Sequence, residues 1–141
     1  MATQWTQAQQ AVIDARTCNL LVAAAAGSGK TAVLVEHLLS RILDRDHPVD
    51  IDRMLIVTFT KAAAAEMRDR LTHALEAAME KEPENRRLER QLSLLPHAHI
   101  STIDSFCMWV VKNHFPLLDL DPDFRIGEDG ELKLLRADVL E

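Results

Sequence analysis

The chain has 141 residues, of which 48% are hydrophobic and 27% charged, and its formal net charge is −6. These values are ordinary for one soluble globular domain, and no apolar run approaches the ~20 residues that a membrane span needs. The two cysteines, Cys18 and Cys107, are too few for a disulfide scaffold, and neither lies in a CxxC or Cys/His spacing. We expect both to be reduced and buried. The N-terminus lacks the basic stretch and apolar core of a signal peptide, so we expect a cytoplasmic protein with no membrane partner.

The negative charge is concentrated towards the C-terminus. Residues 119–141 hold eight acids and three bases, whereas residues 1–118 hold fourteen acids and thirteen bases and are close to neutral. The chain has no basic stripe of the kind that binds nucleic acid non-specifically. Any DNA contact would therefore come from a few well-placed groups.

The N-terminal part alternates a short apolar run with amphipathic helices. Thr6 and Gln9 have the spacing of a capping box, which predicts a helix over residues 7–15. Residues 19–24 are short and apolar, which predicts a buried strand. The helical spacing of apolar residues predicts a second helix over 30–43.

The alternation continues after Pro48. A strand is predicted at residues 54–58, and the alanine-rich run 62–79 predicts a long helix. Residues 81–90 are charged, so we expect them to be exposed. A third short strand is predicted at 98–101.

Apolar residues at helical spacing from Ile103 predict another helix, and residues 124–126 and 132 onward predict a brief strand and a last helix. This order of elements predicts an α/β fold in which helices flank a parallel sheet. Three or four strands are few for such a sheet, and no helix-ending signal follows Leu140-Glu141. We therefore expect a truncated domain.

The strongest chemical signal is the run Ala-Ala-Ala-Gly-Ser-Gly-Lys-Thr at residues 24–31. It fits the P-loop pattern, with alanine in place of the first glycine, and it lies between a predicted strand and a predicted helix. Gly27 and Gly29 permit the tight backbone that points N–H groups at phosphate oxygens. The helix that begins near Lys30 adds its positive dipole end. A flexible loop of small residues before a helix is the alternative interpretation.

The P-loop pattern assigns separate tasks to its last two residues. We expect the Lys30 ammonium to reach the β- and γ-phosphates of ATP, and the Thr31 hydroxyl to ligate Mg²⁺. The residues predicted to bind ATP in this run are Ala24, Ala25, Ala26, Gly27, Ser28, Gly29, Lys30 and Thr31.

Three further segments resemble motifs of superfamily 1 DNA helicases of the UvrD/RecB type. Residues 5–11 resemble the Q motif, in which a glutamine, here Gln9, reads the adenine. A glutamine amide suits this role because it donates and accepts together, as adenine N6 and N7 require. Gln9 also has a purely structural interpretation as the capping partner of Thr6. Residues 58–67 resemble motif Ia and residues 100–107 resemble motif Ib, which contact single-stranded DNA in that superfamily.

The residues that the resemblance implies for DNA binding are Thr58, Phe59, Thr60, Lys61, Ser101 and Thr102. Phe59 is placed to stack on a base, an interaction worth ~1–3 kcal/mol, and the threonines are placed to hold phosphate oxygens. The alternative is a Phe59 in the core and a solvated Lys61. Asp104 stands where many relatives carry histidine, and we interpret it as the acid of a first helical turn capped by Ser101 or Thr102.

Within the superfamily, residues 21–36 and 100–107 are most similar to the helicase subunits of AddAB-type helicase–nucleases. The resemblance implies a partial RecA-like P-loop NTPase domain, of which residues 1–141 form the N-terminal part. It implies ATP and Mg²⁺ as cofactors, single- and double-stranded DNA as partners, and an AddB-like nuclease partner subunit. It also implies a role in double-strand break repair and recombination.

The sequence holds no Walker B Asp-Glu pair after a buried strand, no later helicase motif and no nuclease carboxylates. Phosphoryl transfer needs a placed water and Mg²⁺ held from both sides. We therefore expect this chain to bind nucleotide poorly and to hydrolyse it hardly at all. The resemblance also implies a larger parallel sheet than this chain can form, so we expect an unpaired strand edge and self-association. The alternative function is a stand-alone, non-catalytic P-loop module that binds nucleotide and a protein partner.

Overall fold

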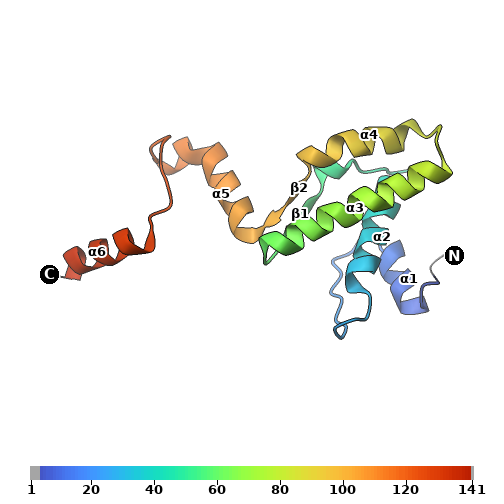
Figure 1. Cartoon of the computed structure of the whole chain (residues 1–141), viewed down its shortest axis with the longest axis horizontal. Coiled ribbons are helices and arrows are strands. Elements are labelled where there is room, and N and C mark those ends of the chain that lie inside the picture. Colours follow the sequence, from blue (N-terminus) through green and yellow to red (C-terminus); the bar gives the residue numbers. More distant parts are fainter. Residues whose placement is uncertain (1–3, 141) are drawn as a thin grey trace. The chain divides into compact units, whose positions relative to one another are not determined.

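A computed structural model describes residues 4–140 of the chain. Its internal contacts divide the chain into two units, residues 1–106 and residues 107–141. The first unit contains α1 (Gln7–Asp14), α2 (Lys30–Ile42), the 3₁₀ helix η1 (Ile51–Arg53), β1 (Leu55–Thr58), α3 (Lys61–Lys81), α4 (Arg86–Leu94), the 3₁₀ helix η2 (Leu95–His97) and β2 (His99–Thr102) (Figure 1). Helix α5 (Ile103–His114) begins in this unit and continues into the second, which also contains η3 (Phe115–Leu118) and α6 (Asp129–Leu140).

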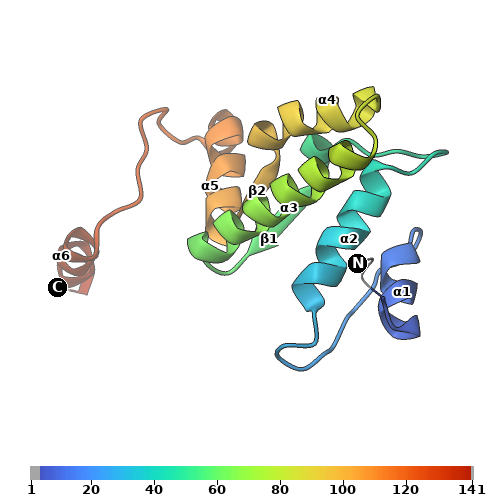
Figure 2. The same ribbon diagram turned by 45° about the vertical axis from the view of Figure 1, so that its right-hand side comes forward.

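Strands β1 and β2 form a parallel two-stranded sheet in which Ile56 pairs with Ile100. Parallel strands need a long crossover connection, and here α3 and α4 provide it. Helix α3 packs on the sheet (Figures 1 and 2). Ile56 and Ile100 are buried, whereas Leu55 and Val57 of β1 are about half exposed because alternate side chains point to opposite faces. The predicted α/β class, a parallel sheet flanked by helices, is confirmed.

The core is built around α3. This helix, which the sequence predicted over residues 62–79, buries Met67, Leu71 and Leu75 at helical spacing. Helix α2 adds Leu38 and Ile42 to the same core. Burial of each large aliphatic side chain contributes about 1.5–3 kcal/mol, so this packing of helices accounts for much of what stabilises the first unit.

Residues 81–90, which we expected to be exposed, are mostly exposed, but helix α4 begins within them and buries Leu88. Asn85 caps the helix by accepting the N–H of Arg87 at 3.1 Å, and Leu88 and Gln91 are completely buried. The many charged residues of this segment lie on the outer side of a one-sided helix. The high charge of the segment therefore did not reveal that Leu88 and Gln91 form a narrow buried stripe on this helix.

Two of the predicted strands do not form. Residues 19–24 are extended but pair with no other strand, and Leu21 is 95% exposed. Residues 124–126 likewise contain no strand. An apolar run becomes a strand only where a neighbour accepts its backbone hydrogen bonds, and β1 and β2 are the only paired strands within residues 4–140. The predicted last helix is present as α6, and Glu141 lies outside the described residues.

The expectation of buried thiols was also wrong, because Cys18 and Cys107 are both exposed. Cys18 follows α1 in a bend, and Cys107 lies on α5, a helix with no buried residue. Of the helices described between residues 4 and 140, none is long and apolar enough to cross a membrane.

Candidate functional site

The loop before α2 adopts a turn that depends on its two glycines. Gly27 has φ 76° and Gly29 has φ 82°, which are left-handed values that glycine reaches without steric cost. Gly29 is the N-cap of α2, and the N–H of Ser28 closes the turn on the carbonyl of Ala25 at 3.3 Å. A Cβ at Gly27 would meet no atom within 4 Å, so its φ and not lack of space requires glycine there.

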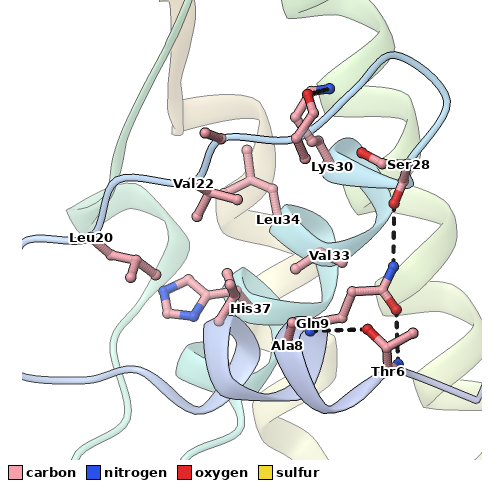
Figure 3. Close-up of a pocket in the computed structure, with 13 residues that line it drawn as sticks. Thr6, Ala8, Gln9, Leu20, Val22, Ser28, Lys30, Val33, Leu34 and His37 are labelled. Carbon is pink, nitrogen blue, oxygen red and sulfur yellow. Dashed lines mark hydrogen bonds between the residues drawn. The ribbon is translucent and has the colours of Figure 1, made fainter.

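Lys30 opens α2 and folds back over the loop (Figure 3). Its Nζ donates to the carbonyl oxygens of Ala24 and Ala25 at 2.7 Å each. Thr31 follows in the first turn of α2 and is exposed. Backbone N–H groups of a first helical turn have no partner within the helix. The loop and helix start thus gather an ammonium, a hydroxyl and backbone donors, which is a suitable set for an anion.

Gln9 contacts both its own helix cap and the loop (Figure 3). Its Oε1 accepts the N–H of Thr6 at 2.9 Å, and its own N–H donates to Thr6 Oγ1 at 3.3 Å, so the predicted capping box is confirmed. Its Nε2 donates to the carbonyl of Ser28 at 3.2 Å, a contact that the sequence did not reveal. An amide has two N–H donors and two acceptor lone pairs, so one of each remains for another ligand.

An apolar cavity of about 600 Å³ adjoins the loop, between α1, the extended segment before the loop, and α2. Leu20, Val22 and Leu34 line it, and Lys30 lies at its margin (Figure 3). His37 also lines it and places Nδ1 3.0 Å from the carbonyl oxygen of Ile13. No sequence pattern pointed to His37, because its place beside the cavity depends on how α1 packs against α2. The cavity volume lies in the range typical of small-molecule sites.

A second group of predicted residues lies at the carboxyl ends of β1 and β2. Thr58 pairs with Thr102, so the segments that follow both strands leave the same edge of the sheet. Phe59 is 92% exposed, and the alternative that placed it in the core is wrong. The Thr60 hydroxyl accepts an N–H of the first turn of α3 at 3.1 Å, and Lys61 opens that helix as an exposed residue.

The end of β2 is organised by a helix cap. Thr102 Oγ1 accepts the N–H of Ser105 at 3.1 Å and donates to Ser105 Oγ at 2.8 Å. Asp104 lies in the first turn of α5 and is exposed, as its structural interpretation predicted. Ser101 is half-buried and donates to the carbonyl of Thr102 at 3.2 Å. Thr102 is the cap residue, so its hydroxyl is already engaged by its own helix.

Comparisons with known proteins agree with the motifs. Residues 5–141 match the family described as UvrD/REP helicase N-terminal domain. The chain is 59% identical over 138 residues to an ATP-dependent helicase/nuclease subunit of Lachnoclostridium phytofermentans, a match that covers 98% of this chain and 10% of that protein. The proteins of the same name from Clostridium perfringens strain 13 and Thermoanaerobacter sp. strain X514 are 56% and 58% identical, over 99% and 100% of this chain and 11% of each relative.

The chain thus spans about a tenth of the length of these curated relatives. The matched region includes the phosphate-type loop, the Gln9 segment and both strand ends described above. The chain therefore belongs to the UvrD/REP helicase N-terminal domain family.

Proposed function

We propose that this chain is the ATP-binding part of an ATP-dependent DNA helicase/nuclease. Residues 1–141 would form the N-terminal part of its RecA-like helicase ATP-binding domain. The observation that carries the proposal is the geometry of residues 24–31, where two left-handed glycines lead into α2 and the Lys30 ammonium folds back onto the loop carbonyls. The relatives are named for dependence on ATP and for helicase and nuclease activity, which supports the same conclusion.

The described residues fit a nucleoside triphosphate. Backbone N–H groups of the loop and of the first turn of α2 would hold phosphate oxygens. Lys30 would exchange its two carbonyl partners for the β- and γ-phosphates, which are stronger, charge-assisted acceptors. Gln9 would offer its remaining donor and acceptor to adenine.

The described residues also fit Mg²⁺ that arrives already bound to the phosphates of the nucleotide. No group of three or more His, Cys, Asp or Glu side chains that could hold a metal occurs within residues 4–140. Mg²⁺ commonly binds through few protein ligands, with substrate phosphates and waters completing its shell. Thr31 would be the ligand from this chain, and the ion would neutralise charge on the phosphates.

The exposed edge after β1 and β2 would contact single-stranded DNA. Phe59 would stack on a base, and the residues beside it would hold the backbone. The residues of this proposed surface are Thr58, Phe59, Thr60, Lys61, Ser101 and Thr102. Thr102 would contribute through its main chain, since its hydroxyl caps α5.

The wider role is part of the same proposal. The intact protein would act on single- and double-stranded DNA with an AddB-like nuclease partner subunit, in double-strand break repair and recombination in the cytoplasm. The 141-residue chain alone would bind nucleotide weakly and turn it over hardly at all, because its sequence holds no Walker B pair.

The direct test is Lys30→Ala in the intact protein, with Mg-ATP affinity measured by calorimetry. Loss of a charge-assisted contact of ~1.5–3 kcal/mol predicts a Kd about 10- to 150-fold higher. Lys61→Ala is the matched control, because it removes the same charge at the first residue of another helix, outside the loop. An unchanged Kd for Lys30→Ala would show that residues 24–31 are not the phosphate site.

A further inference from the structure

The side-chain amide of Gln9 forms hydrogen bonds both to the phosphate loop and to the N-cap of its own helix. Its Nε2 donates to the Ser28 carbonyl at 3.2 Å, across 19 residues of sequence. A Cβ built on Gly29 would lie 3.5 Å from the same Nε2, so the amide is in contact with the loop backbone. We propose that Gln9 is a positioning residue for the phosphate loop, and that it strengthens phosphate binding whether or not the ligand carries a base. The inference rests on the proposed nucleotide site.

The peptide unit that Gln9 holds is one that a phosphate would use. Every peptide bond in the described chain is trans, and a trans peptide points its C=O and its N–H in opposite directions. Because the Ser28 carbonyl points towards Gln9 of α1, the N–H of Gly29 points away from α1. Successive N–H groups in such a loop form its anion-binding concavity. The Gln9 contact therefore fixes the orientation of one of these donors.

This peptide is also where the loop most needs support. Gly27 and Gly29 flank Ser28, and both have left-handed φ values. Glycine loses more conformational freedom than any other residue when its backbone is fixed. A hydrogen bond that holds the Ser28 carbonyl before the ligand arrives reduces the ordering that binding would otherwise require.

The capping box orients the Gln9 side chain for this task. The N–H of Thr6 donates to Oε1 at 2.9 Å, which settles the rotation of the amide and leaves Nε2 facing Ser28 (Figure 3). The two contacts together connect the first turn of α1 to the loop that precedes α2.

The test compares a ligand with a base and one without. Affinities for Mg-ATP and Mg-tripolyphosphate are measured by calorimetry on the intact wild-type protein and on two Gln9 variants, each with its own control variant. Gln9→Met removes the donor without adding charge, and Gln10→Met is its control on an exposed position of the same helix. Gln9→Glu keeps an acceptor for Thr6 but removes the donor to Ser28, and Gln7→Glu is its control for the added charge. Circular dichroism verifies that α1 and the fold persist.

The loss of one neutral hydrogen bond predicts a Kd for tripolyphosphate about three- to ten-fold higher in both Gln9 variants. The loss in Gln9→Glu should exceed any effect of Gln7→Glu, and Gln10→Met should bind as the wild type does. A weaker affinity for ATP with unchanged affinity for tripolyphosphate would overturn the inference, because Gln9 would then act only on the base. A loss in Gln9→Met alone would also overturn it, since the cap and not the loop contact would be responsible. Failure of the wild-type protein to bind either ligand would instead overturn the proposed nucleotide site.

Discussion

At the scale of single residues, neighbours in the sequence are expected to act on different parts of one ligand. Lys30 and Thr31 share the first turn of α2, yet one offers a cation and the other a neutral oxygen. The ammonium suits phosphate oxygens, whereas the hydroxyl suits a hard cation such as Mg²⁺. Their contributions can therefore be separated by the presence of the metal.

Thr31→Ala should weaken binding of Mg-ATP by roughly ten-fold, the size expected for one contact to a charged group. Binding of ATP in EDTA should change little, because the hydroxyl serves the metal. Calorimetry with and without Mg²⁺ measures both, and Thr31→Ser, which keeps the hydroxyl, should retain the Mg²⁺-dependent affinity. Equal losses with and without Mg²⁺ would contradict the role given to Thr31.

The exposure of Phe59 distinguishes the two interpretations of this residue, base stacking on DNA and a place in the core. Because its side chain is 92% exposed, Phe59→Ala should change the free energy of unfolding by less than about 0.5 kcal/mol. Affinity of the intact protein for single-stranded DNA should fall by ~1–3 kcal/mol through lost base stacking. Fluorescence anisotropy with a labelled oligonucleotide and a thermal melt measure the two quantities.

Leu117→Ala is the control for Phe59→Ala, since it truncates another exposed apolar side chain outside the proposed DNA surface. It should leave DNA affinity unchanged. A large fall in melting temperature for Phe59→Ala with normal DNA affinity would show that the DNA role is wrong.

At the scale of elements, α4 is held to η1 by a polar cluster. Gln91 is completely buried, accepts the N–H of Ile51 at 2.8 Å and donates to Asp50 Oδ1 at 2.8 Å. Arg90 and Arg87 form ion pairs with the same carboxylate at 2.9 and 3.1 Å. Burial acts to raise the pKa of Asp50, but the Gln91 hydrogen bond and the two guanidinium groups together hold that pKa below its ordinary value.

Asp50→Asn should lower the free energy of unfolding by about 1–3 kcal/mol at pH 7. The folded-state pKa of Asp50 is depressed, so its stabilisation is fully present above an unfolded-state pKa of about 4 and is lost as the pH falls through the folded-state pKa. The difference between wild type and Asp50→Asn should therefore shrink below about pH 4. Urea unfolding between pH 7 and strongly acidic pH measures it.

Asp46→Asn is the matched control for this titration, because Asp46 is exposed and lies outside the cluster. It should change stability little at any pH. A difference between wild type and Asp50→Asn that stays constant down to strong acid would mean that the cluster does not depend on the Asp50 charge.

At the scale of the whole molecule, a considerable amount of apolar surface is exposed on the first unit. The exposed side chains include Leu20, Leu21 and Val22 before the loop and Leu55 and Val57 on β1. Exposed apolar patches associate with one another. The acidic residues of the chain oppose this by repulsion, but salt screens exposed charges beyond ~10 Å at 0.1 M.

The 141-residue chain should therefore form dimers or larger species that grow with protein concentration and with added salt. Light scattering across a series of both measures this, and Leu21→Lys should weaken the association. Leu117→Lys adds the same charge in the second unit and should have less effect. A monomer at high concentration with a cooperative melt would contradict the prediction.

Features that depend on neighbours along the chain could be predicted from the sequence. The capping box of Thr6 and Gln9, the buried stripe of α3 and the glycine turn before α2 follow from spacings of two to four residues, where local sterics and hydrogen bonds decide the conformation. The family assignment followed from such short motifs as well, because the P-loop and strand-end segments are contiguous in sequence.

Features that depend on partners distant in the chain could be identified only from the folded structure. Residues 19–24 had the composition of a strand but pair with none within residues 4–140, since a strand requires a neighbour that its own sequence does not specify. Gln91 accepts the N–H of Ile51, which is 40 positions away in the sequence. Gln9 donates to the carbonyl of Ser28, which is 19 positions away. Phe59 could be recognised as a surface residue only from the way α3 packs on the sheet. The identity of a residue says how apolar its side chain is, but only the packing shows whether that side chain is covered.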